Sequence, residues 1–213
     1  MNCSKRAARG QEAFLDQHGR IRARKVTGNC AHERTERYES MPETGIISAM
    51  SEISWTYTSR SLAQTEHIGV QLGTLLQSGD VLCLVGDLGT GKTAFARGVA
   101  AGWRSTTAVT SPTFVLIHEH QRDADAMRLQ HIDAYRLERL EDAALLGLED
   151  IFASESAVII EWADRIAPLL PEDRLWIEFA LVPEDEQARQ LTFSAHGLRG
   201  TALLSALRKA FSA

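Results

Sequence analysis

Residues 86–93 are the part of the sequence whose types and spacing most clearly indicate a chemistry. They read Gly-Asp-Leu-Gly-Thr-Gly-Lys-Thr, which matches the phosphate-binding pattern G-x-x-x-x-G-K-[ST]. Gly86 and Gly91 allow backbone conformations that are closed to residues with a Cβ, so successive N–H groups can point at phosphate oxygens. Lys92 adds a cation for the outer phosphates, and the Thr93 hydroxyl is a ligand for Mg²⁺. The pattern therefore predicts a site for a nucleoside triphosphate with Mg²⁺.

The surroundings of this loop strengthen the prediction. An uncharged run, residues 81–85, precedes the loop and is typical of a strand buried on both faces. A helix is expected from residue 92 to about 101, and its free N–H groups and positive end would face the phosphates. The expected nucleotide-binding residues are Gly86, Asp87, Leu88, Gly89, Thr90, Gly91, Lys92, Thr93 and Ala94.

Two carboxylates are candidates for the acidic group that such a site needs near its metal ion. Glu161 follows the apolar run 157–160, and Asp133 follows residues 129–132. A charge placed directly after a buried strand lies at the carboxyl edge of the sheet, where ligands bind. One of the two can hold the metal while the other orients a water molecule, and the residues alone do not decide between them. Lys92 is the third candidate catalytic group.

Aromatic and histidine side chains near these acids admit more than one interpretation. Trp162 is either a core residue or an aromatic platform for a base. His131 shares a strand face with Asp133 and is expected to support that carboxylate by a hydrogen bond. His118 and His120 also share a face, but a zinc site is not predicted because no further ligands follow at zinc-site spacing.

The order of apolar runs and turn residues predicts an α/β fold. We expect a P-loop NTPase-like three-layer sandwich with a mostly parallel central sheet and an antiparallel edge. The expected strands cover residues 55–58, 81–85, 115–118, 129–132, 157–160, 175–181 and 190–195. Helices are expected from a capping pattern at 61–64 to about residue 77, from 92 to about 101, in parts of 137–152 and over 198–211.

Charge is distributed unevenly over the 213 residues, whose formal net charge is −5. Residues 1–40 carry a net charge of +4 and the remainder −9. We expect residues 1–50 to form a basic, disordered extension and residues 51–213 to form the P-loop ATPase domain. The acidic body argues against unaided binding to bulk nucleic acid. Without an apolar run long enough for a membrane span or signal peptide, a soluble, cytoplasmic protein is predicted.

Four motifs in series resemble the TsaE (YjeE) family. They are residues 86–93, Thr-Ser-Pro-Thr at 110–113, His-Ile-Asp-Ala-Tyr-Arg at 131–136 and Glu-Trp at 161–162. A Leu-Leu-Pro sequence at 169–171 also fits, and the resemblance extends over about residues 55–196. One motif alone would be generic, whereas four in this order are specific.

The resemblance implies a bacterial ATPase that is needed to make threonylcarbamoyladenosine in tRNA, with low activity expected in isolation. It implies a complex with TsaB and TsaD, contact with tRNA only through that complex, and no membrane association. Thr93 and Glu161 would bind Mg²⁺, with Asp133 near the metal as a catalytic or water-positioning group. Trp162 would lie at the adenine, and Thr113 would belong to a switch segment near the γ-phosphate. The start of the first helix, residues 62–65, would border the nucleotide.

Three other functions are alternatives to this one. A GTPase is disfavoured because no Asn-Lys-x-Asp sequence follows the phosphate loop. A small-molecule kinase usually needs a large lid, and residues 121–128 are too few for one. A docking module gated by nucleotide, without essential hydrolysis, remains open.

Overall fold

A computed structural model of the protein describes residues 11–15, 21–25, 53–107, 116–137 and 139–211. The chain divides into two compact units, Met1–Gly45 and Ile46–Ala213. In the first unit, strand β1 (Gln11–Leu15) pairs antiparallel with β2 (Ile21–Lys25). The extension expected over residues 1–50, and its disorder, stay predictions.

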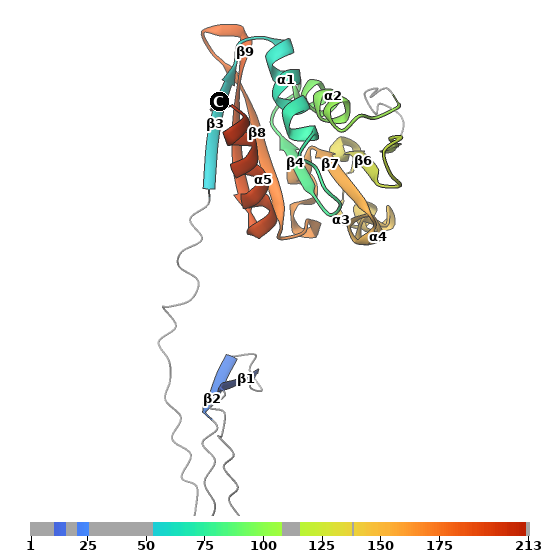
Figure 1. Ribbon diagram of the computed structural model, residues 1–213, viewed down its shortest axis with the longest axis vertical. Helices are drawn as coiled ribbons and strands as arrows, with labels where there is room; N and C mark the ends of the chain where they lie inside the picture. The colour runs from blue at the N-terminus through green and yellow to red at the C-terminus, as the bar shows by residue number, and fades with distance from the viewer. Residues whose placement is uncertain (1–10, 16–20, 26–52, 108–115, 138, 212–213) are drawn as a thin grey trace, which may run out of the picture. The chain divides into compact units, whose positions relative to one another are not determined.

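The second unit is built on a seven-stranded sheet with the order β3-β9-β8-β4-β7-β6-β5 (Figure 1). The three pairings in the centre, β8 with β4, β4 with β7 and β7 with β6, are parallel. The strands are β3 (Ile53–Ser59), β4 (Val81–Val85), β5 (Ile117–His120), β6 (Arg128–Asp133), β7 (Ser156–Glu161), β8 (Arg174–Val182) and β9 (Asp185–His196).

The predicted α/β fold with a parallel centre is confirmed. Every residue of β4 and β7 is buried, as their uninterrupted apolar sequences indicated. Antiparallel strands lie at both edges rather than at one, because β5 pairs antiparallel with β6 opposite the β3-β9-β8 side. The third expected strand is displaced by two residues, to Ile117–His120.

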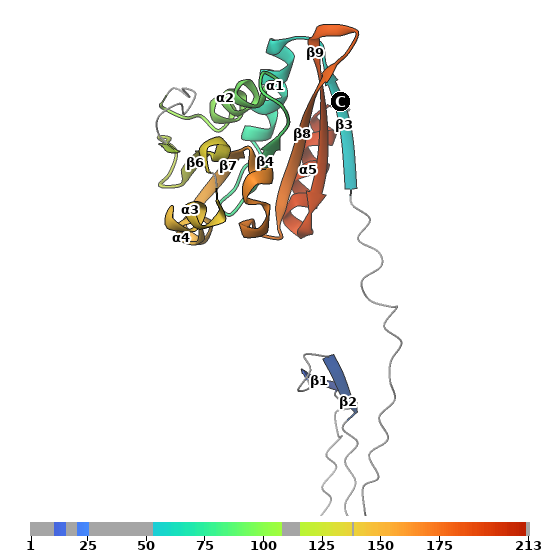
Figure 2. The same ribbon diagram turned by 180° about the vertical axis from the view of Figure 1, so that it is seen from behind.

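Helices cover both faces of the sheet (Figures 1 and 2). On one face, α1 (Leu62–Gly73), α2 (Lys92–Gly102) and α5 (Gly197–Ala210) enclose a core with side chains from β4, β7, β8 and β9. On the other, α3 (Leu140–Leu145), α4 (Leu148–Ala153) and the 3₁₀ segment η2 (Ala163–Leu169) enclose a second core. Among the described residues, every helix is too short or too polar to span a lipid bilayer.

Glycines bring α1 and α2 into backbone contact, which fixes the helix that follows the phosphate loop. A Cβ on Gly73 would lie 2.1 Å from the Val99 carbonyl oxygen, and one on Gly98 would lie 2.1 Å from that of Glu66. Larger residues at either position would push the helices apart. The position of α2, and so of the loop before it, depends on this close approach.

The start of α1 follows the expected capping pattern only in part. The Gln64 amide donates to Ser61 Oγ at 3.2 Å, while the Gln64 side chain accepts from the Arg60 amide instead of from Ser61. The helix ends at Gly73 rather than near residue 77. The turn that follows is closed by Asp80, whose carboxylate accepts the Gln77 amide at 2.7 Å.

Candidate functional site

The predicted phosphate-binding loop, residues 86–93, joins the carboxyl end of β4 to the first turn of α2. Gly86, Gly89 and Gly91 all have positive φ angles, of 132°, 78° and 105°. A Cβ on Gly86 would also lie 2.3 Å from the Phe179 carbonyl oxygen of the neighbouring strand β8. Glycine is therefore required there both by dihedral angle and by space. The Thr90 hydroxyl donates to the Asp87 carbonyl at 2.7 Å and closes the loop internally.

Lys92 is held inside the loop. Its side chain is buried, and Nζ donates to the carbonyl oxygens of Gly86 at 2.6 Å and Asp87 at 2.8 Å. Burial lowers the pKa of this amine. The nearby carboxylates raise it in part, and Glu161 contributes most to that opposing effect. A cation concentrated at the end of a buried strand is suited to bind an anion.

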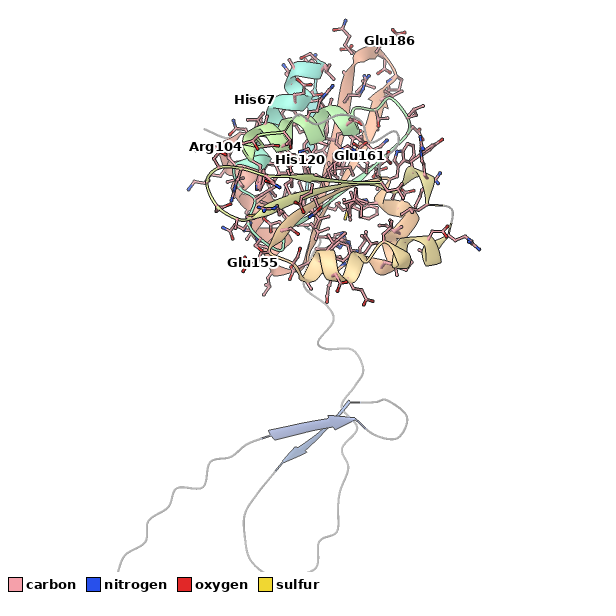
Figure 3. The ribbon with its side chains drawn as sticks, turned by 90° about the vertical axis from the view of Figure 1, so that its right-hand side faces the viewer. His67, Arg104, His120, Glu155, Glu161 and Glu186 are labelled. Carbon is pink, nitrogen blue, oxygen red and sulfur yellow. The ribbon has the colours of Figure 1, made fainter. Side chains whose placement is uncertain are left out.

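Thr93 and Glu161 meet across the interface of α2 and β7. Thr93 Oγ1 donates to Glu161 Oε2 at 2.9 Å, and the other carboxylate oxygen, Oε1, lies 3.0 Å from His131 Nε2. Because a carboxylate can only accept, His131 donates through Nε2. Both His131 and Glu161 are buried, and His120 stacks on His131 with ring centroids 6.3 Å apart. Figure 3 labels His120 and Glu161 among the side chains of the second unit. The expected histidine support is therefore given to Glu161 and not to Asp133.

Asp133 lies beside Glu161 because β6 and β7 are parallel and these two residues are register partners. Its carboxylate accepts the Tyr135 amide at 3.0 Å. Burial raises the pKa of Asp133 above its ordinary value, with the Tyr135 amide opposing that shift and the Glu161 charge adding to it. A carboxylate with this bias towards the protonated form can accept a proton from a water molecule.

Trp162 follows Glu161 directly and stands between β7 and η2. Its ring centroid is 3.9 Å from Lys92 Nζ, and the Tyr135 ring is 4.9 Å away. Its backbone is left-handed, with φ 59° and ψ 39°, which is uncommon for a bulky residue. The contact with Lys92 was not foreseen from the sequence.

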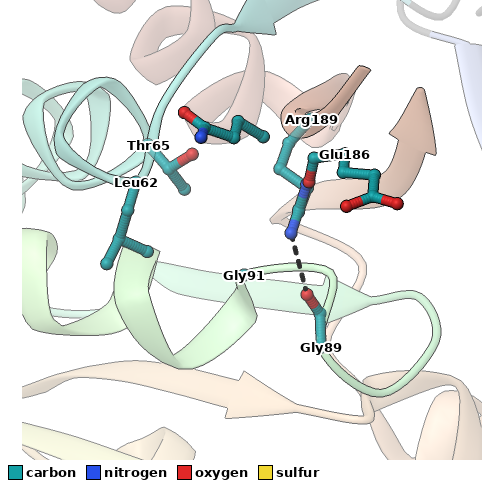
Figure 4. Close-up of a pocket in the computed structure, with 7 residues that line it drawn as sticks. Leu62, Thr65, Gly89, Gly91, Glu186 and Arg189 are labelled. Carbon is teal, nitrogen blue, oxygen red and sulfur yellow. Dashed lines mark hydrogen bonds between the residues drawn. The ribbon is translucent and has the colours of Figure 1, made fainter. Parts of the chain in front are cut away.

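A pocket of about 340 Å³ borders the loop at Gly89 and Gly91 (Figure 4). Arg189 reaches from β9 to the phosphate loop, and its Nη2 lies 3.4 Å from the Gly89 carbonyl oxygen. The volume is within the range of small-molecule sites. The residues that line it are Leu62, Thr65, Gly89, Gly91, Glu186, Gln187 and Arg189.

The structure thus brings Lys92, Thr93, Glu161, Asp133 and Trp162 together at the carboxyl end of the central strands. Thr113 and the rest of the 110–113 motif lie outside the described residues. Within the described ranges, no group of three or more His, Cys, Asp and Glu side chains is arranged to hold a metal ion. Mg²⁺ does not require such a group, because it is usually held by one or two carboxylates together with substrate phosphates and water.

Some site residues carry no recognisable signal in the sequence. Glu186, Gln187 and Arg189 belong to a strand that begins more than 90 residues after the loop, and they form no motif. Leu62 and Thr65 have no motif of their own, and only the family resemblance implied that residues 62–65 border the nucleotide. Only the folded sheet shows that these residues share a pocket with the glycines of the loop.

Comparisons with known proteins give consistent results. A family described as "Threonylcarbamoyl adenosine biosynthesis protein TsaE" matches residues 59–191. The tRNA threonylcarbamoyladenosine biosynthesis protein TsaE of Bacillus subtilis is 37% identical over 150 residues, covering 70% of this chain and 90% of the relative. The protein of the same description from Streptomyces coelicolor is 38% identical over 138 residues, covering 62% and 90%.

A solved structure agrees with these sequence matches. The crystal structure of Bacillus subtilis YdiB superposes with a TM-score of 0.62 at 30% identity. It covers 76% of this chain and 99% of the solved chain. The shared region therefore includes most of the second compact unit.

Proposed function

The chain belongs to the TsaE family, whose role is in threonylcarbamoyladenosine biosynthesis in tRNA, and we propose that it is a Mg²⁺-dependent ATPase of that process. One observation carries the proposal. The Thr93 hydroxyl and the Glu161 carboxylate lie 2.9 Å apart beneath a loop whose glycines have positive φ and whose lysine is buried. These are the groups that bind a nucleoside triphosphate and its metal ion.

The phosphates would bind along the loop, and the base would enter the pocket beside Leu62 and Arg189. This pocket borders Gly89 and Gly91, which places it next to the phosphate-binding amides. It combines an apolar side chain, Leu62, with the polar groups of Glu186 and Arg189, as base and ribose sites commonly do. Trp162 does not line the pocket, so we place the adenine there instead of on the Trp162 ring.

Thr93 and Glu161 would hold the metal ion, since both offer oxygen atoms, which Mg²⁺ prefers. When bound, Mg²⁺ neutralises charge on the phosphates. His131 keeps the Glu161 carboxylate in place by its hydrogen bond, a support that metal-binding side chains generally need. Asp133, next in register to Glu161, would orient the attacking water and take up its proton.

The proposed partners are TsaB and TsaD, with tRNA reached indirectly through them. Relatives at 37–38% identity are described as tRNA threonylcarbamoyladenosine biosynthesis proteins, and the chain spans about nine-tenths of their length. We propose that ATP hydrolysis by this chain supports repeated turnover of the complex. A cytoplasmic location is part of the same proposal.

Release of phosphate from ATP and from GTP tests this function. We expect slow release from ATP by the full chain alone, faster release with TsaB and TsaD, and little release from GTP. The Asp133→Asn variant should bind ATP but release phosphate at least ~100-fold more slowly, since a positioned base contributes about that much. Transfer of phosphate to a metabolite would favour a kinase instead. Formation of the modified tRNA by Asp133→Asn at the wild-type rate would favour a docking role.

A further inference from the structure

The ammonium group of Lys92 has a fixed position, and two of its three N–H donors have partners. In the described part of the chain these partners are the carbonyl oxygens of Gly86 and Asp87, at 2.6 and 2.8 Å. Both belong to the loop itself and therefore hold the ammonium group from one direction. Among the described residues the third donor has no hydrogen-bond acceptor, so it can serve a ligand.

The aromatic face of Trp162 completes the surroundings of this group. Lys92 Nζ lies 3.9 Å from the ring centroid, well within the range of a cation–π contact. The Trp162 ring packs in turn against Tyr135, whose carbonyl oxygen accepts a hydrogen bond from Arg165. Trp162 takes up a left-handed backbone at the end of β7, which places its ring here. The ring is therefore held by its neighbours at the position where it meets the lysine.

We propose that Trp162 is a positioning residue for the phosphate-binding lysine. Its ring and the two loop carbonyls fix the Lys92 ammonium group so that the remaining N–H points at the outer phosphates. This inference rests on the proposed function, because it assumes that the loop binds a triphosphate. It assigns Trp162 to the phosphates, whereas a base platform would assign it to the adenine.

Tripolyphosphate, which has no base, separates these two roles. A residue that acts through Lys92 influences the binding of ATP and of tripolyphosphate alike. A residue that stacks on the adenine influences ATP alone. Both affinities can be measured by calorimetry with the full chain and Mg²⁺.

Replacement of Trp162 by leucine removes the aromatic face but keeps an apolar side chain. We expect Trp162→Leu to lower the affinities for ATP and tripolyphosphate by the same factor, about threefold to thirtyfold. This is the range of a cation–π contact at a partly to fully desolvated site. Trp162→Phe keeps an aromatic ring and should recover most of the affinity for both. If Trp162 had only a structural role, the Leu and Phe variants would have the same ligand affinities whenever their melting temperatures match.

Two further variants serve as matched controls. Trp176→Leu changes a half-buried tryptophan of β8 that packs in the second core, and it should leave both affinities unchanged. Leu62→Ala alters the pocket wall, so it should lower the affinity for ATP and leave the affinity for tripolyphosphate unchanged.

The position of the lysine can also be measured without any ligand. The chain has only four lysines, Lys5, Lys25, Lys92 and Lys209, so lysine-selective NMR labelling gives few signals. The ε-protons of one lysine should be shifted upfield by the Trp162 ring, and the shift should be lost in Trp162→Leu. The absence of any such signal in the wild-type protein would overturn the inference.

The binding results divide in the same way. Loss of ATP affinity with unchanged tripolyphosphate affinity in Trp162→Leu would overturn the inference and favour the base platform. Equal losses in the Leu and Phe variants would overturn it as well. A wild-type chain that binds neither ligand would overturn the proposed function, and the inference with it. A chain that binds both, with Trp162→Leu equal to wild type, overturns the inference alone.

Discussion

A buried carboxylate lies near each end of strand β4, Asp80 at the amino end and Glu161 at the carboxyl end, and the two have different partners. At the amino end, Asp80 precedes the strand and forms a two-point ion pair with Arg199, with both N–O distances at 2.6 Å. Asp80 also accepts the Gln77 amide, and Arg199 donates to the Leu75 carbonyl. The buried carboxylate therefore has a partner for each oxygen within the chain.

At the carboxyl end, the partners are incomplete. Lys92 uses two of its three donors on loop carbonyls, and His131 Nδ1 is buried without a hydrogen-bond partner among the described residues. Glu161 is buried between a hydroxyl and an imidazole, and no lysine or arginine side chain is bonded to it in the described ranges.

With the proposed function, the same strand supports stability at one end and would support ligand binding at the other. Burial of charge is costly unless hydrogen bonds and opposite charges compensate for it. A cluster that is fully compensated within the chain is structural. A cluster in which some donors and acceptors have no partner can be stabilised by a charged ligand. We therefore propose the carboxyl end of β4 as the binding end.

The largest effect should follow from Arg199→Ala, which leaves the Asp80 carboxylate buried without its cation. We expect a loss of about 3 kcal/mol in the free energy of unfolding, measured in urea, because an uncompensated buried charge is strongly destabilising. ATP affinity of the folded protein should not change. Arg97→Ala is the control, since its pair with Glu66 is exposed and should be worth less than ~1 kcal/mol. Equal losses in the two variants would remove the distinction between a buried and a surface pair.

Lys92→Ala should have the next largest effect, and on binding instead of on stability. The loop loses its cation, so ATP affinity should fall at least ~100-fold, about what a charge-assisted hydrogen bond contributes. The melting temperature should stay close to that of the wild type, in contrast to Arg199→Ala. Lys209→Ala, at the last turn of α5, is the control. Undiminished ATP affinity in Lys92→Ala would contradict the phosphate site.

His131→Phe should lower the affinity for the metal ion by about tenfold. This is the lower end of the loss that follows when a metal ligand loses its supporting hydrogen bond. The measurement is a titration with Mn²⁺ in the presence of ATP, followed by electron paramagnetic resonance. His118→Phe changes a histidine of the neighbouring strand β5 and should leave the Mn²⁺ affinity unaltered. An unchanged affinity in His131→Phe would mean that Glu161 is held without this histidine.

The smallest of these effects should be the change in stability of Asp133→Asn, a modest gain that depends on pH. Burial raises the pKa of Asp133 in the folded chain, so the folded state binds this proton more tightly than the unfolded state. Stability contributed by this group is complete below the ordinary pKa and is lost as the pH rises through the raised pKa. The variant should therefore melt at a higher temperature than the wild type near pH 7 and at the same temperature near pH 3. A lower melting temperature at pH 7 would contradict this sign.

The sequence predicts those parts of the molecule that are determined by neighbouring residues. The loop at 86–93 was recognisable because its glycines, lysine and threonine are contiguous, and β4 and β7 because their residues are apolar without interruption. The burial expected for Cys83 is confirmed, and it raises the pKa of that thiol to about 12. Local sequence was sufficient for each of these features.

Features that depend on which elements become neighbours were not predictable in this way. His131 was assigned to Asp133, its neighbour on the same strand, but it supports Glu161 because β6 and β7 pair in parallel. Arg189 reaches the loop only because β9 returns along β8. The contact of Trp162 with Lys92 depends on a left-handed turn, which is unusual for tryptophan and has no sequence signature.

The claim that the carboxyl end of β4 is a site for ATP with Mg²⁺ is tested most directly by calorimetry on the wild type and Glu161→Gln. The full chain is titrated with ATP, with and without Mg²⁺. We expect Mg²⁺ to strengthen ATP binding by the wild type, and the variant to bind ATP without that gain, because the amide is a poorer metal ligand than the carboxylate. The same gain from Mg²⁺ in both proteins, or no ATP binding by the wild type, would contradict it.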